Sequence, residues 1–462
     1  MRRLLALATL AAAGCAPNYT LPPTHLPDAV RPGDQVVVAR DWWKSFDDPV
    51  LDRLVEDAFA SSPTLEAAVA RVDAAKARLG ISGSQQLPAV NASLAGQRQQ
   101  FSELTNPPGG EVTAYSANLQ ASWEIDLWGR IRNEVAASES DLLSASYGRD
   151  AVQLALAAQV AQGYFQLRAF DAELETTRRT VKSREDSYAL REKRFAGGIT
   201  SELDLRQAET ELANARAQVP DLTDAVSRAE GTLAILAGAP PNALFGRGVP
   251  RGRSIDAIPV PPAVPEGLPS DLLLRRPDLR EAEENLRAAQ ARVAAARTAW
   301  FPRIALTGAY GGESLAFGDL FTGPARAWSF AGSLVAPVFN SGLTAAQVDL
   351  ASANERAAAA AYRDTVIRAF ADARNAITAK RQAADRVAAR AQSVDALRRQ
   401  VRLATLRYDN GYSNYLEVLD AERTLFSAEL ALAEARRGHL ASAVDLYRAL
   451  GGGWTMRESR GG

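Results

Sequence analysis

The chain has 462 residues and a formal net charge of −1, from 53 basic and 54 acidic residues. The chain therefore has no excess of positive charge, and nucleic acid is not an expected partner. The single cysteine, Cys15, and the two histidines, His25 and His439, exclude a disulfide framework and a metal cluster of cysteine and histidine. We find no glycine-rich phosphate loop and no catalytic constellation, and therefore expect neither an enzyme nor a cofactor site.

The chain begins with a secretion signal. Two arginines precede the apolar run from Leu4 to Ala13, which is too short to cross a bilayer as a helix. The run AAGC that ends at Cys15 resembles a bacterial lipobox, which implies that residues 1–14 are removed and that the cysteine is lipidated. Such a lipid tethers a chain to a membrane without making it span. Ordinary signal cleavage beside an incidental cysteine is the alternative. Residues 15–47 are expected to form an extended leader.

The rest of the chain contains one large unit twice. The segment RFAGGITSELDLRQAETEL from Arg194 aligns with RYDNGYSNYLEVLDAERTL from Arg407, an offset of 213 residues. The segment LEAAVARVDAAKARL from Leu65 aligns with LREAEENLRAAQARV from Leu279 at nearly the same offset. A repeat this long is not a solenoid or propeller unit, so each copy is a large structural half. The expected boundaries are a first repeat at 48–236, a proline-rich linker at 237–271, a second repeat at 272–450 and a tail at 451–462.

Each repeat begins with a helix, which two predicted strands follow. The segment from Tyr115 to Leu127 alternates strictly between apolar and polar residues, with Leu119, Trp123 and Ile125 on the apolar face. A strand of this length crosses a bilayer when tilted, whereas strands of soluble sandwiches are usually shorter. The other expected strands are Val90 to Gln97, Arg303 to Tyr310 and Trp328 to Val338, and the exposed loops expected between strands are Phe101 to Val112 and Ser314 to Arg326.

Two strands per repeat give four strands per chain, which are too few to close a barrel. In lipid every backbone N–H and C=O group must be paired, so a chain with four membrane strands has to oligomerise. A dimer would supply eight strands and a trimer twelve, and the polar faces of the strands would then line a lumen.

A long helix follows the strands of each repeat. Residues 343–410 contain neither glycine nor proline, and residues 129–194 contain no proline. At 1.5 Å per residue each helix would be a rod of roughly 100 Å, which is typical of a coiled coil. Charged residues recur along both segments, so neither is apolar enough to cross a membrane.

The long helices end at glycine turns around Gly198 and Gly411, from which a second helix returns. Thr200 and Ser413 are the expected N-caps, because a hydroxyl at that position accepts a hydrogen bond from a backbone N–H of the first turn. Each repeat is therefore expected to make a helical hairpin, whose second helix ends near residue 236 in the first copy and near residue 450 in the second.

Several long motifs resemble one known family. The segment LPSDLLLRRPDLREAEENLRAAQARVAAARTAWFPRIALTG from Leu268 is similar to the signature of the TolC-like outer membrane factors. DWWKSFDDPVLDRLV from Asp41, SWEIDLWGRIR from Ser122, APVFNSG from Ala336 and RYDNGYSNYLEVLDAERTL from Arg407 match the same family in order. The resemblance covers nearly the whole mature chain. With the lipobox, it is nearest to the lipoprotein branch of the RND efflux outer-membrane channels, the OprM and NodT-like group.

The resemblance implies an internally duplicated α+β membrane protein. A homotrimer would form a twelve-stranded transmembrane β-barrel, with four strands from each chain, continuous with a long periplasmic α-helical coiled-coil barrel. The implied function is a passive gated duct of the cell outer membrane, which exports small molecules or drugs within a tripartite RND-type efflux system. Its implied partners are a periplasmic adaptor protein, an inner-membrane RND pump and outer-membrane lipid. A lipid-anchored periplasmic coiled-coil scaffold is the alternative, and it would bury Leu119, Trp123 and Ile125 in protein.

The resemblance also implies a gate near the periplasmic ends of the helices. Asp204, Glu417 and Asp420 match the acidic positions of the family gate, where rings of carboxylates favour cations, and Tyr408 matches its aromatic position. For Glu417, a simple favourable charge at a helix N-terminus is the alternative. Ser413 stands where some relatives carry a basic gate partner. The adaptor protein is expected to contact the hairpin tips at Gly198, Thr200, Gly411 and Ser413.

Overall fold

The described residues of the computed structural model fall into two compact units, which we name the sheet unit and the hairpin unit. The structure describes residues 21, 36–39, 41–102, 104, 110–240, 248–261 and 275–456. The sheet unit is built from residues 70–147 and 280–365, and the hairpin unit from the described residues of 25–69, 148–279 and 366–462. The predicted lipidation site Cys15 and the predicted signal peptide lie outside the described residues.

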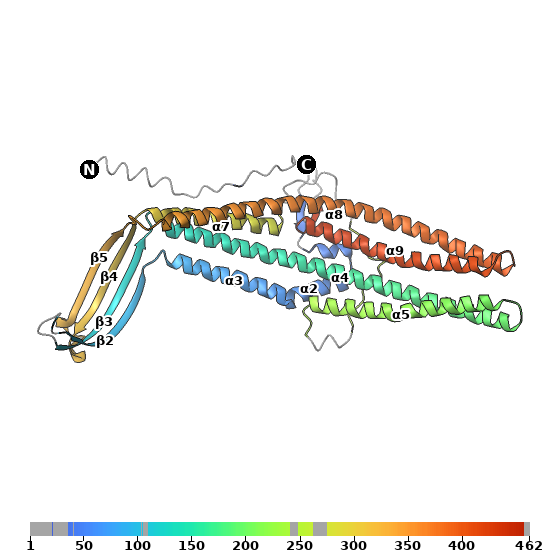
Figure 1. Cartoon of the computed structure of the whole chain (residues 1–462), viewed down its shortest axis with the longest axis horizontal. Coiled ribbons are helices and arrows are strands. Elements are labelled where there is room, and N and C mark those ends of the chain that lie inside the picture. The colour runs from blue at the N-terminus through green and yellow to red at the C-terminus, as the bar shows by residue number, and fades with distance from the viewer. Residues whose placement is uncertain are drawn as a thin grey trace, which may run out of the picture. The chain divides into compact units, whose positions relative to one another are not determined.

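The sheet unit contains one antiparallel sheet of four strands, in the order β2-β3-β4-β5 (Figure 1). β2 (Ala89–Phe101) and β3 (Gly110–Ile125) belong to the first repeat, and β4 (Arg303–Ser314) and β5 (Arg326–Val335) belong to the second. β3 pairs directly with β4, so the strands of the two repeats join into one sheet. The four predicted strands are therefore confirmed, but their bounds differ: β2 and β4 end later than predicted, β3 begins at Gly110 and ends at Ile125, and β5 begins at Arg326 and ends at Val335.

Helices enter the sheet at one end and leave from the same end. α3 (Pro63–Ser84) leads into β2, and α7 (Pro277–Arg297) leads into β4. α4 (Arg130–Ala196) and α8 (Leu343–Asp409) follow β3 and β5, and each has 67 residues. Asp126 fixes the start of α4, because its carboxylate accepts hydrogen bonds from the backbone N–H groups of Ile131 and Arg132 at 3.0 and 2.8 Å.

The hairpin unit contains two helical hairpins. α5 (Glu202–Leu236) runs beside the later part of α4, and α9 (Tyr415–Ala449) runs beside the later part of α8 (Figure 1). Exposed ion pairs link the two helices of each hairpin, Arg216 to Glu185 at 2.7 Å and Arg398 to Glu429 at 2.7 Å. Among the described residues, every helix is too short or too polar to be a membrane span.

A buried cluster of large side chains holds the base of the hairpin unit together. Phe46 comes from a short 3-10 turn (Trp42–Phe46), Leu51 from α2 (Pro49–Ser61), and Tyr164 and Phe165 from α4, and all four are buried. Burial of such side chains stabilises a fold by about 1.5–3 kcal/mol each. Among the described residues, β1 (Val36–Ala39) pairs antiparallel with β6 (Gly453–Met456), a pairing that the sequence analysis did not predict.

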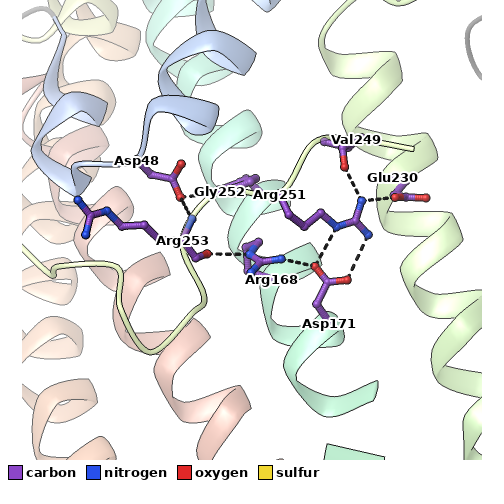
Figure 2. Close-up of polar contacts among 9 residues, drawn as sticks. Asp48, Arg168, Asp171, Glu230, Val249, Arg251, Gly252 and Arg253 are labelled. Carbon is purple, nitrogen blue, oxygen red and sulfur yellow. Dashed lines mark hydrogen bonds and ion pairs between the residues drawn. The ribbon is translucent and has the colours of Figure 1, made fainter. Parts of the chain in front are cut away.

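The described part of the predicted linker is bound tightly to the hairpin unit (Figure 2). Arg251 forms an ion pair with Asp171 at 3.0 Å and another with Glu230. The next residue, Gly252, lies so close to Asp48 that a Cβ added there would come within 2.1 Å of a carboxylate oxygen. Residues 248–261 are therefore part of the packed structure, and glycine is required at position 252.

The loop between β4 and β5 is mostly exposed, as predicted over Ser314 to Arg326. It also contains two 3-10 turns (Phe317–Asp319 and Gly323–Ala325), and its Leu320 and Ala325 are buried, which the sequence analysis did not predict. The loop folds back on the strands, because Gly312 of β4 leaves room for the carbonyl of Leu320 where a side chain would clash.

Candidate functional site

The sheet has one apolar face and one polar face. The register places Leu119 opposite Tyr310, and Tyr310 opposite Trp328, so their side chains lie on the same side. That face is open: Leu119 is 54 % exposed, Trp328 68 % and Phe330 80 %. All four strands contribute to this apolar face. By the same register it carries Val90, Ala92 and Leu94 of β2; Tyr115, Ala117, Leu119, Ala121, Trp123 and Ile125 of β3; Ile304, Leu306, Gly308 and Tyr310 of β4; and Trp328, Phe330 and Leu334 of β5.

The opposite face is lined by small and polar side chains. It carries Ser116, Asn118, Gln120, Ser122 and Glu124 of β3, at the positions between the apolar ones. A sheet with a large exposed apolar face is stable only where lipid or another protein covers that face. Within the described part of the chain, β2 and β5 each have one unpaired edge. The sheet thus needs a neighbouring strand at both edges, an apolar medium on one side and water on the other.

At their far ends the two hairpins turn in the same way. Gly198 and Gly411 have positive φ angles of 71° and 78°, which favour glycine. The residues after them close the turns, because Ile199 N–H donates to the Arg194 carbonyl at 2.8 Å and Tyr412 N–H to the Arg407 carbonyl at 2.8 Å. This is the hydrogen-bond pattern of a Schellman motif, as the glycine turns predicted.

The predicted helix caps are wrong by one residue. Ser201 caps α5 by accepting from Asp204 N–H at 3.2 Å, and Asn414 caps α9 by accepting from Glu417 N–H at 3.3 Å. Thr200 instead donates its hydroxyl proton to the Asp204 carboxylate at 2.7 Å. The hydroxyl of Ser413 is buried and has no hydrogen-bond partner among the described residues. The glycine turns each keep one more residue in the loop than expected, which shifts both helix starts.

An arginine between two tyrosines joins the hairpins close to their tips, because α4 ends at Ala196, α8 ends at Asp409 and α9 begins at Tyr415. Arg191 of α4 lies 4.7 Å from the ring centre of Tyr408 and 4.3 Å from that of Tyr415. Its side chain is 95 % buried to solvent, and two of its nitrogens have no hydrogen-bond partner within the described residues. Tyr415 also shares a 3.1 Å hydrogen bond with Ser187. A desolvated cation over an aromatic face is worth about 2 kcal/mol or more.

Two ion pairs join the same hairpins further along. Arg184 of α4 pairs with Glu422 of α9, and Glu211 of α5 pairs with Arg423 of α9. Burial raises the pKa of Glu422, and the Arg184 guanidinium acts in the opposite direction to keep the carboxylate charged. We name the set of Arg184, Arg191, Tyr408, Tyr415 and Glu422 the hairpin latch.

The sequence analysis identified one of the latch residues, Tyr408. Arg184 and Arg191 carried a signal that was missed, since they lie seven residues apart and so share one face of the long helix. Glu422 aligns with Glu209 of the first repeat, but Glu209 pairs with Arg206 on its own helix at 2.8 Å. The duplicated glutamate thus has different partners in the two copies, which alignment of the repeats does not reveal.

The predicted gate acids are placed in two groups. Glu417 and Asp420 are exposed and lie one turn apart on α9, and Glu417 is 3.9 Å from Arg407. Asp204 is partly buried and accepts the Thr200 hydroxyl, so it does not join them. Tyr408 contacts Arg191 and Tyr415 and is not an isolated ring over an opening.

The family model described as "Outer membrane efflux protein" matches residues 54–239 and 268–452 of this chain.

The chain belongs to the outer membrane efflux protein family.

Individual members of the outer membrane efflux protein family match along almost their whole length. The chain is 34 % identical to the probable efflux pump outer membrane protein TtgC of Pseudomonas putida, over 98 % of this chain and 96 % of that one. It is 29 % identical to the probable outer membrane lipoprotein SilC of Salmonella typhimurium, over 98 % and 99 %.

Solved channel structures have the same fold. The Campylobacter jejuni CmeC outer membrane channel superposes with a TM-score of 0.88 at 26 % identity, covering 97 % of this chain and 96 % of that one. The open state of the Neisseria gonorrhoeae MtrE outer membrane channel gives a TM-score of 0.84 at 31 % identity, covering 95 % and 98 %.

The family membership confirms the main predictions. This protein is an outer-membrane efflux channel and not an enzyme, and its fold class is the predicted one. The scaffold alternative is set aside, because the match extends over both repeats and over all four strands. The repeat boundaries, the lipid on Cys15 and the roles of the gate and tip residues stay predictions.

Proposed function

We propose that three copies of this chain form a passive, gated duct across the outer membrane, which serves a tripartite RND-type efflux system. The observation that carries this proposal is the open four-stranded sheet with one apolar and one polar face. Both sheet edges need partners, since unpaired backbone groups are very costly in lipid. Eight strands from a dimer enclose only enough room for side chains, whereas twelve strands from a trimer leave a wider lumen.

The hairpin tips supply the docking surface for a periplasmic adaptor in this proposal. Ile199 and Tyr412, at equivalent positions of the two repeats, are both 78 % exposed. Leu203 and Leu416 are also equivalent and exposed. Apolar side chains presented at matched positions around Gly198, Thr200, Gly411 and Ser413 suit a protein partner, because exposed apolar groups gain free energy when they are buried. The relatives named as efflux pump proteins support a partner of this kind.

Planar-bilayer conductance of the purified mature protein, with its oligomeric mass measured in detergent, tests the proposal. We expect discrete cation-selective current steps from a trimer. If the wild-type trimer is silent because its gate is closed, the Arg184→Ala variant of the hairpin latch should conduct. A monomer that never conducts, with or without that substitution, would overturn the duct.

Neutralising Glu417 and Asp420 together should lower the preference for cations. In a trimer each exposed carboxylate is repeated three times around the axis, and such rings attract cations. In the Glu417→Gln/Asp420→Asn variant we expect the potassium-to-chloride permeability ratio, taken from the reversal potential in a salt gradient, to fall severalfold toward unity. Asp224→Asn is the matched control, because this exposed acid on α5 pairs with Arg228 of its own helix at 2.7 Å. An unchanged permeability ratio in the double variant would show that Glu417 and Asp420 do not contribute to the selectivity of the gate.

We also propose that Cys15 carries a covalent lipid. The lipobox-like run before it and the relative named as a probable lipoprotein support this. The intact mass of the membrane-extracted chain should exceed that of a chain starting at residue 15 by the mass of the lipid, and Cys15→Ala should remove the excess. We expect the variant to stay in the membrane fraction, because the barrel spans the bilayer by itself. A wild-type mass without the excess would exclude lipidation.

A further inference from the structure

The loop between β4 and β5 lies on the apolar face of the sheet. Phe317 of the loop packs edge-on against Tyr115, with 5.4 Å between the ring centres, and Tyr115 belongs to the apolar face. Leu320 is only 1 % exposed, and its carbonyl lies over Gly312, whose pairing with Ala117 puts it on the same face. The loop therefore covers the outside of the proposed barrel at the end away from the helices.

A pocket of about 440 Å³ lies between this loop and the strands. A volume of this size is typical of small-ligand pockets, which are mostly apolar with a few placed polar groups. Its apolar lining comes from Ala92, Ala117, Leu119 and Tyr310 of the strands and from Leu320 and Phe321 of the loop.

One cation borders the pocket. Arg326 lines it at the start of β5 and is exposed, and within the described part of the chain its guanidinium has no ion pair or hydrogen bond. The other arginine at this end of the apolar face, Arg98, pairs with Glu111 of the neighbouring strand. An arginine without a partner beside an apolar pocket suits a ligand that has a hydrocarbon part and an anionic oxygen group, because a guanidinium binds phosphate in a forked geometry.

We propose that this pocket binds an anionic membrane lipid, with an acyl chain against Ala117, Leu119 and Tyr310 and its phosphate on Arg326. The proposal rests on the proposed function, which places the apolar face in the bilayer and the loop at the outer leaflet. Leu315 and Phe321 of the loop are both more than two-thirds exposed and would contact the surrounding acyl chains.

Native mass spectrometry of the purified full-length trimer tests the site, with phosphatidylglycerol and phosphatidylcholine of the same acyl chains as probes. We expect wild type to retain one phosphatidylglycerol per chain, with about tenfold preference over phosphatidylcholine, because the choline cation of the latter offsets the charge of the same phosphate and is repelled by Arg326. Arg326→Gln should abolish the preference, and the matched control Arg98→Gln should keep it. Ala92→Phe, which fills the pocket, should weaken the binding of both lipids.

An Arg326→Gln channel that prefers phosphatidylglycerol as strongly as wild type would overturn the site, and so would unchanged lipid binding in Ala92→Phe. Conductance measured on the same preparations separates this outcome from a failure of the proposed function. Both substituted residues lie on the outer side of the sheet, so we expect the variants to conduct like wild type. Wild-type channels that conduct but show no lipid preference would refute the lipid site alone.

Discussion

Arg184→Ala should open the channel. The substitution leaves Glu422, whose side chain is 22 % exposed, without its partner against α4, and removal of one member of a fully buried ion pair costs about 3–5 kcal/mol, which is the upper bound here. Because the pair joins α4 to α9, that cost falls on the contact between the two hairpins of one chain. We expect a marked rise in the mean current per trimer in planar bilayers.

The controls for this prediction come from the same helices. Arg216→Ala removes an exposed ion pair within one hairpin, so it should leave the current unchanged. The double variant Arg184→Met/Glu422→Met should return the current toward the wild-type level, because an apolar pair avoids the unpaired buried charge. Equal currents from Arg184→Ala and Arg216→Ala would show that the latch does not hold the channel closed.

The same variant should acquire a pH dependence. Burial raises the pKa of Glu422, and in the absence of Arg184 the opposing effect comes from Arg191, which is weaker. As the pH falls, the Glu422 carboxyl group is neutralised, and a neutral carboxyl group is tolerated between the hairpins. The extra current of Arg184→Ala should therefore decrease on acidification, whereas an effect of the missing arginine side chain on packing alone would not change with pH.

Asp48→Ala should cause the largest loss of stability in the hairpin unit. The buried carboxylate of Asp48 accepts the Tyr164 hydroxyl at 2.8 Å, the Arg253 N–H at 3.0 Å and the Val50 N–H at the start of α2 at 2.9 Å. The substitution removes a helix cap, worth about 1 kcal/mol, and leaves two further donors without their acceptor, at about 1–3 kcal/mol each. We expect a total loss of about 3–7 kcal/mol, seen as a lower thermal midpoint in detergent by circular dichroism.

Two matched variants make the Asp48 result specific. Asp48→Asn keeps an oxygen at the start of α2 and should be intermediate in stability. Asp57→Ala changes an exposed acid on the same helix and should be close to wild type. Burial and the Asp48 hydrogen bond raise the pKa of Tyr164, so its hydroxyl stays protonated and the contact holds throughout the neutral range. A midpoint for Asp48→Ala equal to that of Asp57→Ala would refute this role.

Local patterns predicted the elements of this protein well. The alternation around Leu119 and Trp123 is a property of one strand, and the lack of proline over 129–194 is a property of one helix. The duplication predicted that whatever one repeat forms, the other forms too. These signals require no knowledge of tertiary packing, which is why the strands and the long helices were found.

The parts that were missed depend on how distant segments pack. Arg184 and Glu422 lie in different repeats, and their pairing follows from how one hairpin lies against the other. The caps moved from Thr200 and Ser413 to the next residues because the glycine turns closed one residue later. The loop around Leu320 is mostly exposed, as its glycine and proline indicated, but the packing of Leu320 over Gly312 depends on how the loop and the strand lie together.

The direct pairing of β3 with β4 has a consequence for the order of assembly. β2 and β3 are adjacent in sequence and can form a hairpin early, but Ile125 meets Ile304 only after the whole first helical hairpin and the linker have been made. Long-range pairing of this kind is slow, because the intervening chain must be ordered first. Until then the apolar side of the first two strands has neither lipid nor sheet around it, so the newly exported chain is most prone to aggregate before its second half arrives.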